Sequence, residues 1–270
     1  MSASAGDHGL SLSAIADALR AAGCVFAAEE AALLVAEAST GEALRAMVGQ
    51  RAAGLPLEHV LGWAEFCGLR VAVDPGVFVP RRRSEFLVRQ AAALCLPGTI
   101  VVDLACGCGA IGAAIANLTA GVELHACDVD QVAVRCARRN LLPFGGHVYA
   151  GDLYQPLPRA LRGRVAVIAA NLPYVPAAQV RLMPAEARTH EPLAALDGGD
   201  DGLDVLRRAA AGAGDWLTPG GRLLVEIDAG QADAASAAFA AVGLTAAVAN
   251  DEELDATVIT GRRALTELHR

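Results

Sequence analysis

The sequence lacks any unbroken apolar run of the roughly 18 residues that a membrane-spanning helix requires, although hydrophobic residues make up 54% of the chain. Arg, Asp, Glu or His interrupts every apolar-rich segment, so we expect a soluble protein with no membrane partner. Residues 1–8 lack a basic stretch followed by an apolar block, and no secretory signal is expected. These absences predict a cytoplasmic location.

Positive charge is also scarce. Lys and Arg together number 22 against 30 for Asp and Glu, which gives a net charge of −8. A protein whose affinity rests on phosphate backbone contacts usually carries an excess of basic residues. Direct binding to nucleic acid is therefore not expected.

No paired cysteine framework is present. The chain has an odd number of cysteines scattered through apolar segments, unlike a secreted disulfide scaffold; they are Cys24, Cys67, Cys95, Cys106, Cys108, Cys127 and Cys136. Zinc sites usually use Cys-x₂₋₄-Cys pairs, whereas Cys106 and Cys108 are too closely spaced and no matching second pair follows. We expect buried free thiols and no metal.

Two segments precede the long C-terminal part of the chain. Residues 1–62 are Ala-rich with helical spacing, and we expect a small helical substrate-recognition domain of three helices. Ser11 is the expected cap of the first helix, and Ser39 with Glu42 forms a capping box for the third. Residues 63–84 alternate like strands and predict a β-hairpin connector that turns at Asp74-Pro75-Gly76.

From residue 85 to 270, apolar β-branched runs alternate with helical stretches, which predicts an α/β fold with a parallel, doubly wound, Rossmann-like sheet. The expected strands cover residues 99–103, 122–127, 147–150, 165–170, 222–227, 244–249 and 255–260. Only a short turn separates the last two runs. They must pair antiparallel, because a parallel crossover needs about a dozen residues.

A glycine-rich loop follows the first of these strands and opens a helix. It contains the candidate ligand-binding residues Asp103, Ala105, Cys106, Gly107 and Gly109. Glycines let the backbone approach a ligand closely, but such a loop by itself suits a dinucleotide equally well.

Acidic residues at three successive strand ends favour a nucleoside ligand without phosphate over a dinucleotide. Asp128 is placed to accept both ribose hydroxyls of a nucleoside, and Asp152 to accept from an adenine amine. S-adenosylmethionine (SAM) carries a nucleoside but no phosphate, so it suits this set better than NAD. The further candidate SAM-binding residues are Val129, Gly151, Leu153 and Asn171. Taken singly, Asp128 also suits a cap for the helix beginning near Asp130, and Asp152 a solvated turn.

The tetrapeptide Asn171-Leu172-Pro173-Tyr174 follows the fourth strand, where ligands of doubly wound sheets bind. The Asn171 side-chain oxygen and the Leu172 carbonyl can accept two N–H bonds from a planar nitrogen and aim its lone pair at a methyl donor. Pro173 stiffens the loop and Tyr174 can pack on the planar group. An ordinary turn with a packed tyrosine is the alternative interpretation.

Several motifs in order resemble the HemK-type protein-glutamine N5-methyltransferases, which methylate the Gly-Gly-Gln loop of peptide-chain release factors. The motifs cover residues 56–62, 66–69, 77–81 with Ser84 and Glu85, 151–153, 191–192, 196, 198–199, 201–203, 219–221 and 226–227. The resemblance implies a class I methyltransferase sheet, SAM as cofactor, and a release-factor glutamine as acceptor.

The chain departs from that family at two places. Leu172 replaces a proline of the usual Asn-Pro-Pro-Tyr, although the backbone carbonyl survives. Arg82 and Arg83 stand where Pro and Glu are expected, and we interpret both as a solvated cluster. Arg81 is expected to pair with Glu85 or another acid.

Three other functions stay open from the sequence. They are methylation of adenine N6 in nucleic acid, methylation of a small molecule of secondary metabolism, and SAM-dependent regulation without catalysis. The acidic balance and the lack of an aromatic, basic recognition segment disfavour the first. We expect a monomeric enzyme.

Overall fold

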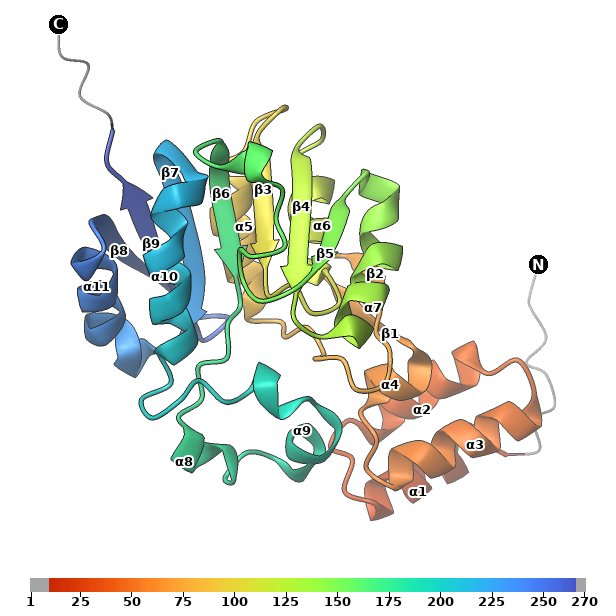
Figure 1. Cartoon of the computed structure of the whole chain (residues 1–270). Helices are drawn as coiled ribbons and strands as arrows, with labels where there is room; N and C mark the ends of the chain where they lie inside the picture. Colours follow the sequence, from red (N-terminus) through yellow and green to blue (C-terminus); the bar gives the residue numbers. More distant parts are fainter. Residues whose placement is uncertain (1–9, 266–270) are drawn as a thin grey trace, which may run out of the picture.

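The computed structural model describes residues 10–265, with the side chains of Ala185 and Ala187 left out of the description. The stretch on which the absence of a secretory signal was judged lies outside the described residues. Figure 1 shows a central sheet between helices, with a group of N-terminal helices beside it. Among the described residues no helix is both long and apolar enough to cross a membrane.

Four helices form the N-terminal region, where three were predicted; they are α1 (Leu12–Ala21), α2 (Ala27–Glu37), α3 (Gly41–Ala52) and α4 (Leu57–Leu61). The predicted cap of α1 is confirmed, because Ser11 Oγ accepts from the Ala14 amide at 3.2 Å. The predicted capping box of α3 is wrong. Thr40, in extended conformation, caps that helix through its Oγ, since it directly precedes the first helical residue.

The predicted hairpin exists, but its turn was misplaced. Strands β1 (Trp63–Phe66) and β2 (Leu69–Ala72) pair antiparallel. Cys67 and Gly68 join them with φ of 50° and 72°, the two positive angles that a tight hairpin turn requires. The expected turn at residues 74–76 does form, but no strand follows it.

The predicted sheet is confirmed. Seven strands lie in the order β5-β4-β3-β6-β7-β9-β8, and β9 runs antiparallel to both of its neighbours, β7 and β8. Their bounds are β3 (Ile100–Leu104), β4 (Glu123–Asp128), β5 (His147–Ala150), β6 (Val165–Ala170), β7 (Leu217–Ile227), β8 (Leu244–Asp251) and β9 (Ala256–Arg263). The strand order reverses between β3 and β6, which opens a ligand crevice at their carboxyl ends.

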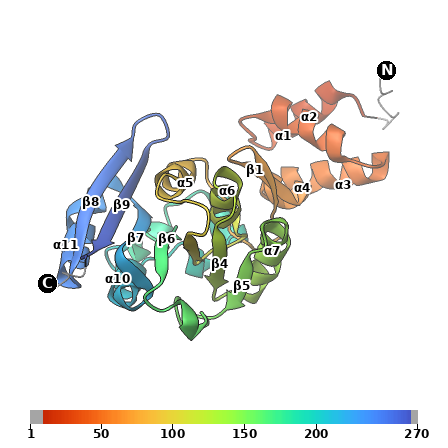
Figure 2. The same ribbon diagram turned by 90° about the horizontal axis from the view of Figure 1, so that it is seen from above.

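Helices cover both faces of the sheet, as Figure 2 shows from above. One face packs against α5 (Ser84–Ala92), α6 (Ala110–Leu118) and α7 (Gln131–Leu141), and the other against α10 (Asp204–Trp216) and α11 (Ala232–Ala241). Alternate β3 residues supply the two cores: Val101 faces the first, and Ile100 and Val102 face the second.

A long connection between β6 and α10 carries α8 (Ala177–Val180), α9 (Ala185–His190) and a 3₁₀ turn (Leu193–Ala195). It lies beyond the carboxyl ends of the strands and beside the N-terminal helices (Figure 1). Arg51 of α3 forms an ion pair with Glu186 of α9 at 3.3 Å. The other 3₁₀ turns are Leu142–Phe144, Arg159–Leu161 and Ala229–Gln231.

The expectation of free thiols is confirmed. All seven cysteines are unbridged; six are buried and Cys67 is partly buried. Burial raises the pKa of the Cys106 and Cys127 thiols beside the loop after β3. These side chains therefore stay neutral and pack as small apolar groups.

Candidate active site

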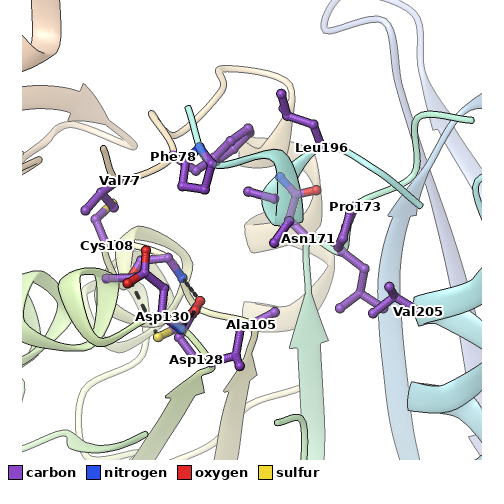
Figure 3. Close-up of a pocket in the computed structure, with 18 of the residues that line it drawn as sticks. Val77, Phe78, Ala105, Cys108, Asp128, Asp130, Asn171, Pro173, Leu196 and Val205 are labelled. Carbon is purple, nitrogen blue, oxygen red and sulfur yellow. Dashed lines mark hydrogen bonds between the residues drawn. The ribbon is translucent and has the colours of Figure 1, made fainter. Parts of the chain in front are cut away.

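A cavity of about 650 Å³ opens where the strand order reverses. Figure 3 shows Asp128 and Asp130 on one side of it, Asn171 and Pro173 on the other, and Ala105 between them. The lining comes from residues 105–108, 110–111, 127–130, 133, 151–153 and 171–175, from Phe66 and the segment 77–84 before α5, from the connection between β6 and α10, and from Val205 and Arg208 of α10. Most of the predicted site residues thus meet in one place.

The loop after β3 is held against the end of β4 by two hydrogen bonds that its backbone amides donate. The Cys106 amide donates to the Cys127 carbonyl at 3.0 Å, and the Gly107 amide donates to Asp128 Oδ2 at 2.8 Å. Ala105 and Gly107 have φ of 55° and 54°, a left-handed conformation that glycine accepts at low cost and alanine at a higher one. Ala105, Cys106 and Gly107 all line the cavity.

Asp128 lines the cavity and is not the cap of α7. Asp130 is that cap, since its Oδ1 accepts from the Val132 amide at 2.7 Å. The Asp128 oxygens accept from the Gly107 and Asp130 amides, and one further lone pair remains on each. Burial raises the pKa of Asp128, while these amides oppose the rise. The neighbouring Val129 also lines the cavity.

Two predicted site residues, Asp103 and Gly109, do not line the cavity. Asp103 is fully buried below the loop, where its Oδ2 accepts from the Gly112 amide at 2.8 Å. Gly109 begins α6 against α7, and a Cβ there would lie 3.2 Å from Ala137 Cβ and from Leu141 Cγ. Both residues shape the loop from beneath instead of facing a ligand.

Gly151, Asp152 and Leu153 line the next part of the cavity after β5. Asp152 lies in a turn and is partly exposed, so the predicted turn and the predicted position at the site are both present. Its carboxylate forms an ion pair with Arg208 of α10, which lines the cavity as well. Arg208 carried no sequence signal, because its partner is far away in the chain.

All four residues of the predicted acceptor tetrapeptide line the cavity. The Asn171 Nδ2 donates to Ser84 Oγ at the start of α5, at 3.2 Å. Leu172 directs its side chain into the second core and is 2% exposed. Its apolar side chain therefore anchors the loop after β6 at a position where the resembling family has proline.

Tyr174 points its hydroxyl toward a buried carboxylate. The hydroxyl donates to Glu226 Oε1 at 3.3 Å and accepts from Arg83 Nη2. The Arg83 guanidinium lies 5.3 Å from the centre of the tyrosine ring. Burial and the Glu226 charge raise the pKa of Tyr174, so the phenol stays protonated.

The interpretation of Arg83 as a solvated cation is incomplete, because its side chain, although 41% exposed, also pairs with a buried acid. Its Nε lies 3.2 Å from Glu226 Oε1, and the Glu226 side chain is only 1% exposed. A carboxylate buried this deeply needs a nearby cation, which Arg83 supplies. Arg82 is exposed, as predicted. Arg81 pairs with Glu191 at 2.7 Å, so the acid is not Glu85.

An apolar end of the cavity was not predicted. It combines side chains before α5 with others from the connection between β6 and α10; the residues are Phe66, Val77, Phe78, Pro80, Met183, Pro192, Ala195 and Leu196. They come together only in the folded chain, although several stand in the motifs noted above.

This sheet order and this cavity define the chain as a class I methyltransferase. A family model described as Methyltransferase small domain matches residues 68–253. A methyltransferase from Pyrococcus furiosus has the same fold, with a TM-score of 0.56 and 16% identity over 73% of this chain and 90% of that one.

The chain belongs to the release factor glutamine methyltransferase family. The protein of that name from Geobacter sulfurreducens is 36% identical over 203 residues, which cover 74% of this chain and 70% of that protein. Its namesake from Gloeobacter violaceus is 39% identical over 183 residues, covering 66% of this chain. The match spans 63% of the Gloeobacter protein, slightly less than two thirds of its length.

Proposed function

We propose that this enzyme transfers the methyl group of SAM to the side-chain amide nitrogen, N5, of a glutamine in the Gly-Gly-Gln loop of a peptide-chain release factor. The observation that carries the proposal is the position of Asn171, which shares one cavity with Asp128. The names of the relatives support the choice of acceptor. Release factors act at the ribosome, so the proposed reaction is cytoplasmic.

The charges of the cavity suit a cofactor without phosphate. Its three lining arginines are each paired with a carboxylate: Arg81 with Glu191, Arg83 with Glu226 and Arg208 with Asp152. Asp128 retains acceptor capacity for ribose hydroxyls. Residues 105–107, Val129 and residues 151–153 would surround the rest of the nucleoside, as Asp103 and Gly109 support the loop from below.

The acceptor amide needs orientation more than deprotonation, because its nitrogen lone pair is delocalised into the carbonyl. Asn171 Oδ1 and the Leu172 carbonyl accept its two N–H bonds and turn the lone pair toward the cofactor. Bound SAM would supply an electrophilic methyl to that nitrogen in place of its bond to sulfur, with S-adenosylhomocysteine and one proton from the nitrogen as the other products. Pro173 and Tyr174 hold the loop that makes these contacts.

The helical region 1–62 is proposed to contact the protein substrate outside the cavity. None of its described residues lines the cavity, whereas Phe66 of the connector does. The region lies beside α9, which follows the acceptor loop (Figure 1). The division of the chain at residues 62 and 84, and the monomeric state, stay predictions.

Radiolabelled SAM tests the substrate directly. We expect one methyl group on a purified release factor, and a Gln→Ala change in its Gly-Gly-Gln loop should abolish the label. Label that persists after this change would refute the proposed acceptor. Mass spectrometry of the product identifies the methylated residue, and methyladenine in a lysate treated with enzyme would instead move the function to nucleic acid.

The Asn171→Ala variant tests the proposed division of the cavity. We expect turnover to fall by at least about 100-fold, since the acceptor loses an orienting hydrogen bond. The affinity for SAM, measured by calorimetry, should stay within about twofold because Asn171 faces the acceptor. A large loss of SAM affinity would contradict this role.

A further inference from the structure

Ser84 connects the acceptor loop to the buried carboxylate behind it. It is the first residue of α5, is 2% exposed, and stands next to Arg83. Its Oγ is 3.2 Å from Asn171 Nδ2. Arg83 and Ser84, adjacent in the sequence, thus contact Tyr174 and Asn171, the two ends of the acceptor tetrapeptide.

The two polar atoms of an asparagine side-chain amide have opposite hydrogen-bonding roles. Its nitrogen only donates and its oxygen only accepts, so a flipped side chain would present N–H to the acceptor's own N–H. Which end faces the cavity follows from the hydrogen-bond network around the amide. If Ser84 accepts from Asn171 Nδ2, Oδ1 is left for the acceptor.

The buried acid Glu226 favours one direction of the Ser84 hydroxyl. A serine hydroxyl both donates and accepts, whereas an ionised carboxylate accepts only. Glu226 is 1% exposed, and Arg83 and the Tyr174 hydroxyl stabilise its charged form. Burial raises the pKa of Glu226, and Ser84 is among the groups that oppose this rise. An ionised carboxylate on that side favours the Ser84 proton there and leaves the Oγ lone pair to accept from Asn171 Nδ2.

We propose that Ser84 is a positioning residue whose hydroxyl accepts from Asn171 Nδ2 and so fixes the amide of Asn171 with Oδ1 toward the methyl acceptor. The inference rests on the proposed function, in which Asn171 holds the acceptor nitrogen. It also gives Arg83 a part in the site, at a position where the resembling family has an acidic residue.

Ser84→Ala removes the acceptor for Asn171 Nδ2 and lets the amide turn over. We expect kcat to fall by about 10- to 100-fold with SAM affinity within about twofold. Ser84→Thr keeps the hydroxyl and should restore kcat to within about threefold of the starting enzyme. Ser236→Ala, on α11 and away from the cavity, is the matched control and should not change kcat.

A double-mutant cycle separates orientation from simple packing. In the Asn171→Asp variant both side-chain oxygens accept hydrogen bonds. A 180° rotation of the carboxylate therefore presents the same acceptor to the substrate. Ser84→Ala should then lower kcat less in the Asn171→Asp background than in the starting enzyme. An equal loss in both backgrounds would show a packing role and overturn the proposal.

The two proposals fail in different ways. If the starting enzyme does not methylate the glutamine, the proposed function is refuted. If it does, and Asn171→Ala abolishes turnover while Ser84→Ala keeps full kcat, the role of Ser84 is refuted and the proposed function stands. A Ser84→Thr variant as slow as Ser84→Ala would also overturn the role of the hydroxyl.

Discussion

At the scale of single residues, Asp128 is the side chain on which we expect nucleoside binding to depend most. It combines two backbone contacts of 2.8 and 2.9 Å with a place on the cavity wall. The contacts hold the carboxylate in one orientation before a ligand arrives. This preorganisation reduces the entropy lost on binding.

Replacing Asp128 by alanine should therefore weaken SAM binding by about 1–3 kcal/mol, through the loss of charge-assisted hydrogen bonds. Isothermal titration calorimetry measures the change. Asp130→Ala is the comparison, because Asp130 lines the same wall and caps α7; it should lose helix stability but little SAM affinity. Unchanged affinity in Asp128→Ala would refute the ribose assignment.

Local sequence placed Asp128 at the cavity, but it missed the buried partner of Arg83. An acid at a strand end has a position that the strand pattern itself predicts. Arg83 contacts Tyr174 across 91 residues of chain, and a basic residue before a helix otherwise looks solvated. Its role depends on a buried partner, which no local pattern reveals.

At the scale of elements, the packing of α6 against α7 depends on a glycine. Gly109 has φ of 80°, and a Cβ would approach Ala137 and Leu141 within 3.2 Å. Gly98 has φ of 83° with nothing within 4 Å of such a Cβ. Both positions therefore have a left-handed backbone, but only Gly98 has room for a Cβ.

Gly98→Ala should lower the free energy of unfolding by about 1–2 kcal/mol through the left-handed backbone alone. Gly109→Ala should lose about 1–3 kcal/mol more, since the two helices must move apart. Urea denaturation of both variants measures the difference. Equal losses would show that α6 and α7 accommodate the added methyl freely.

Strand β3 contains a buried acid, Asp103, whose pKa is raised. Burial raises the pKa of Asp103 to about 8, although the Gly112 amide opposes the rise. Since the folded pKa lies above the ordinary value of 3.8, the folded protein binds the proton more tightly than the unfolded chain. This contribution to stability is complete below the ordinary value and is lost as the pH rises through about 8.

We therefore expect the unfolding free energy to decline between about pH 4 and pH 8, with a slope of at most about 1.4 kcal/mol per pH unit from this group, and the contribution to level off above pH 8. Asp103→Asn, which does not titrate, should flatten the decline between about pH 4 and 8. Denaturant titrations at several pH values test this. A variant with the same slope would assign the decline to other groups.

The elements differ in how well local pattern located them. Strand β6 has the predicted bounds because a continuous apolar run marks it, and β5 has them because Gly146 and Gly151 flank it. The hairpin turn was misplaced because Pro75-Gly76 is a stronger local turn signal than Cys67-Gly68. The pairing of β1 with β2 determines which of the two turns joins the strands, and this pairing cannot be read from either turn sequence.

At the scale of the whole molecule, Arg51 joins the N-terminal helices to the connection above the cavity. Its side chain pairs with Glu30 at 2.7 Å and with Glu186 at 3.3 Å, and it is 11% exposed. The contact with α9 sets the helical region beside the segment that follows the acceptor loop. The helical region is thus held close to the proposed entry of a protein substrate.

Arg51→Met removes both ion pairs and should raise KM for a protein substrate by about 3- to 10-fold while leaving SAM affinity within about twofold. Steady-state kinetics and calorimetry measure these effects. Arg45→Met, exposed on the same helix, is the matched control. Equal KM values in the two variants would mean that this contact does not position the helical region for the substrate.

The sequence by itself determined the alternation of strands and helices, the glycine-rich loop, the acids at strand ends and the acceptor tetrapeptide. These features follow from backbone preferences and from the period of burial, which act over a few residues. Only the tertiary structure decided that Asp103 and Gly109 lie beneath the loop, that Arg83 pairs with Glu226, and that Ser84 meets Asn171. The partner and ionisation of a buried side chain depend on segments far apart in the chain, and folding alone brings those together.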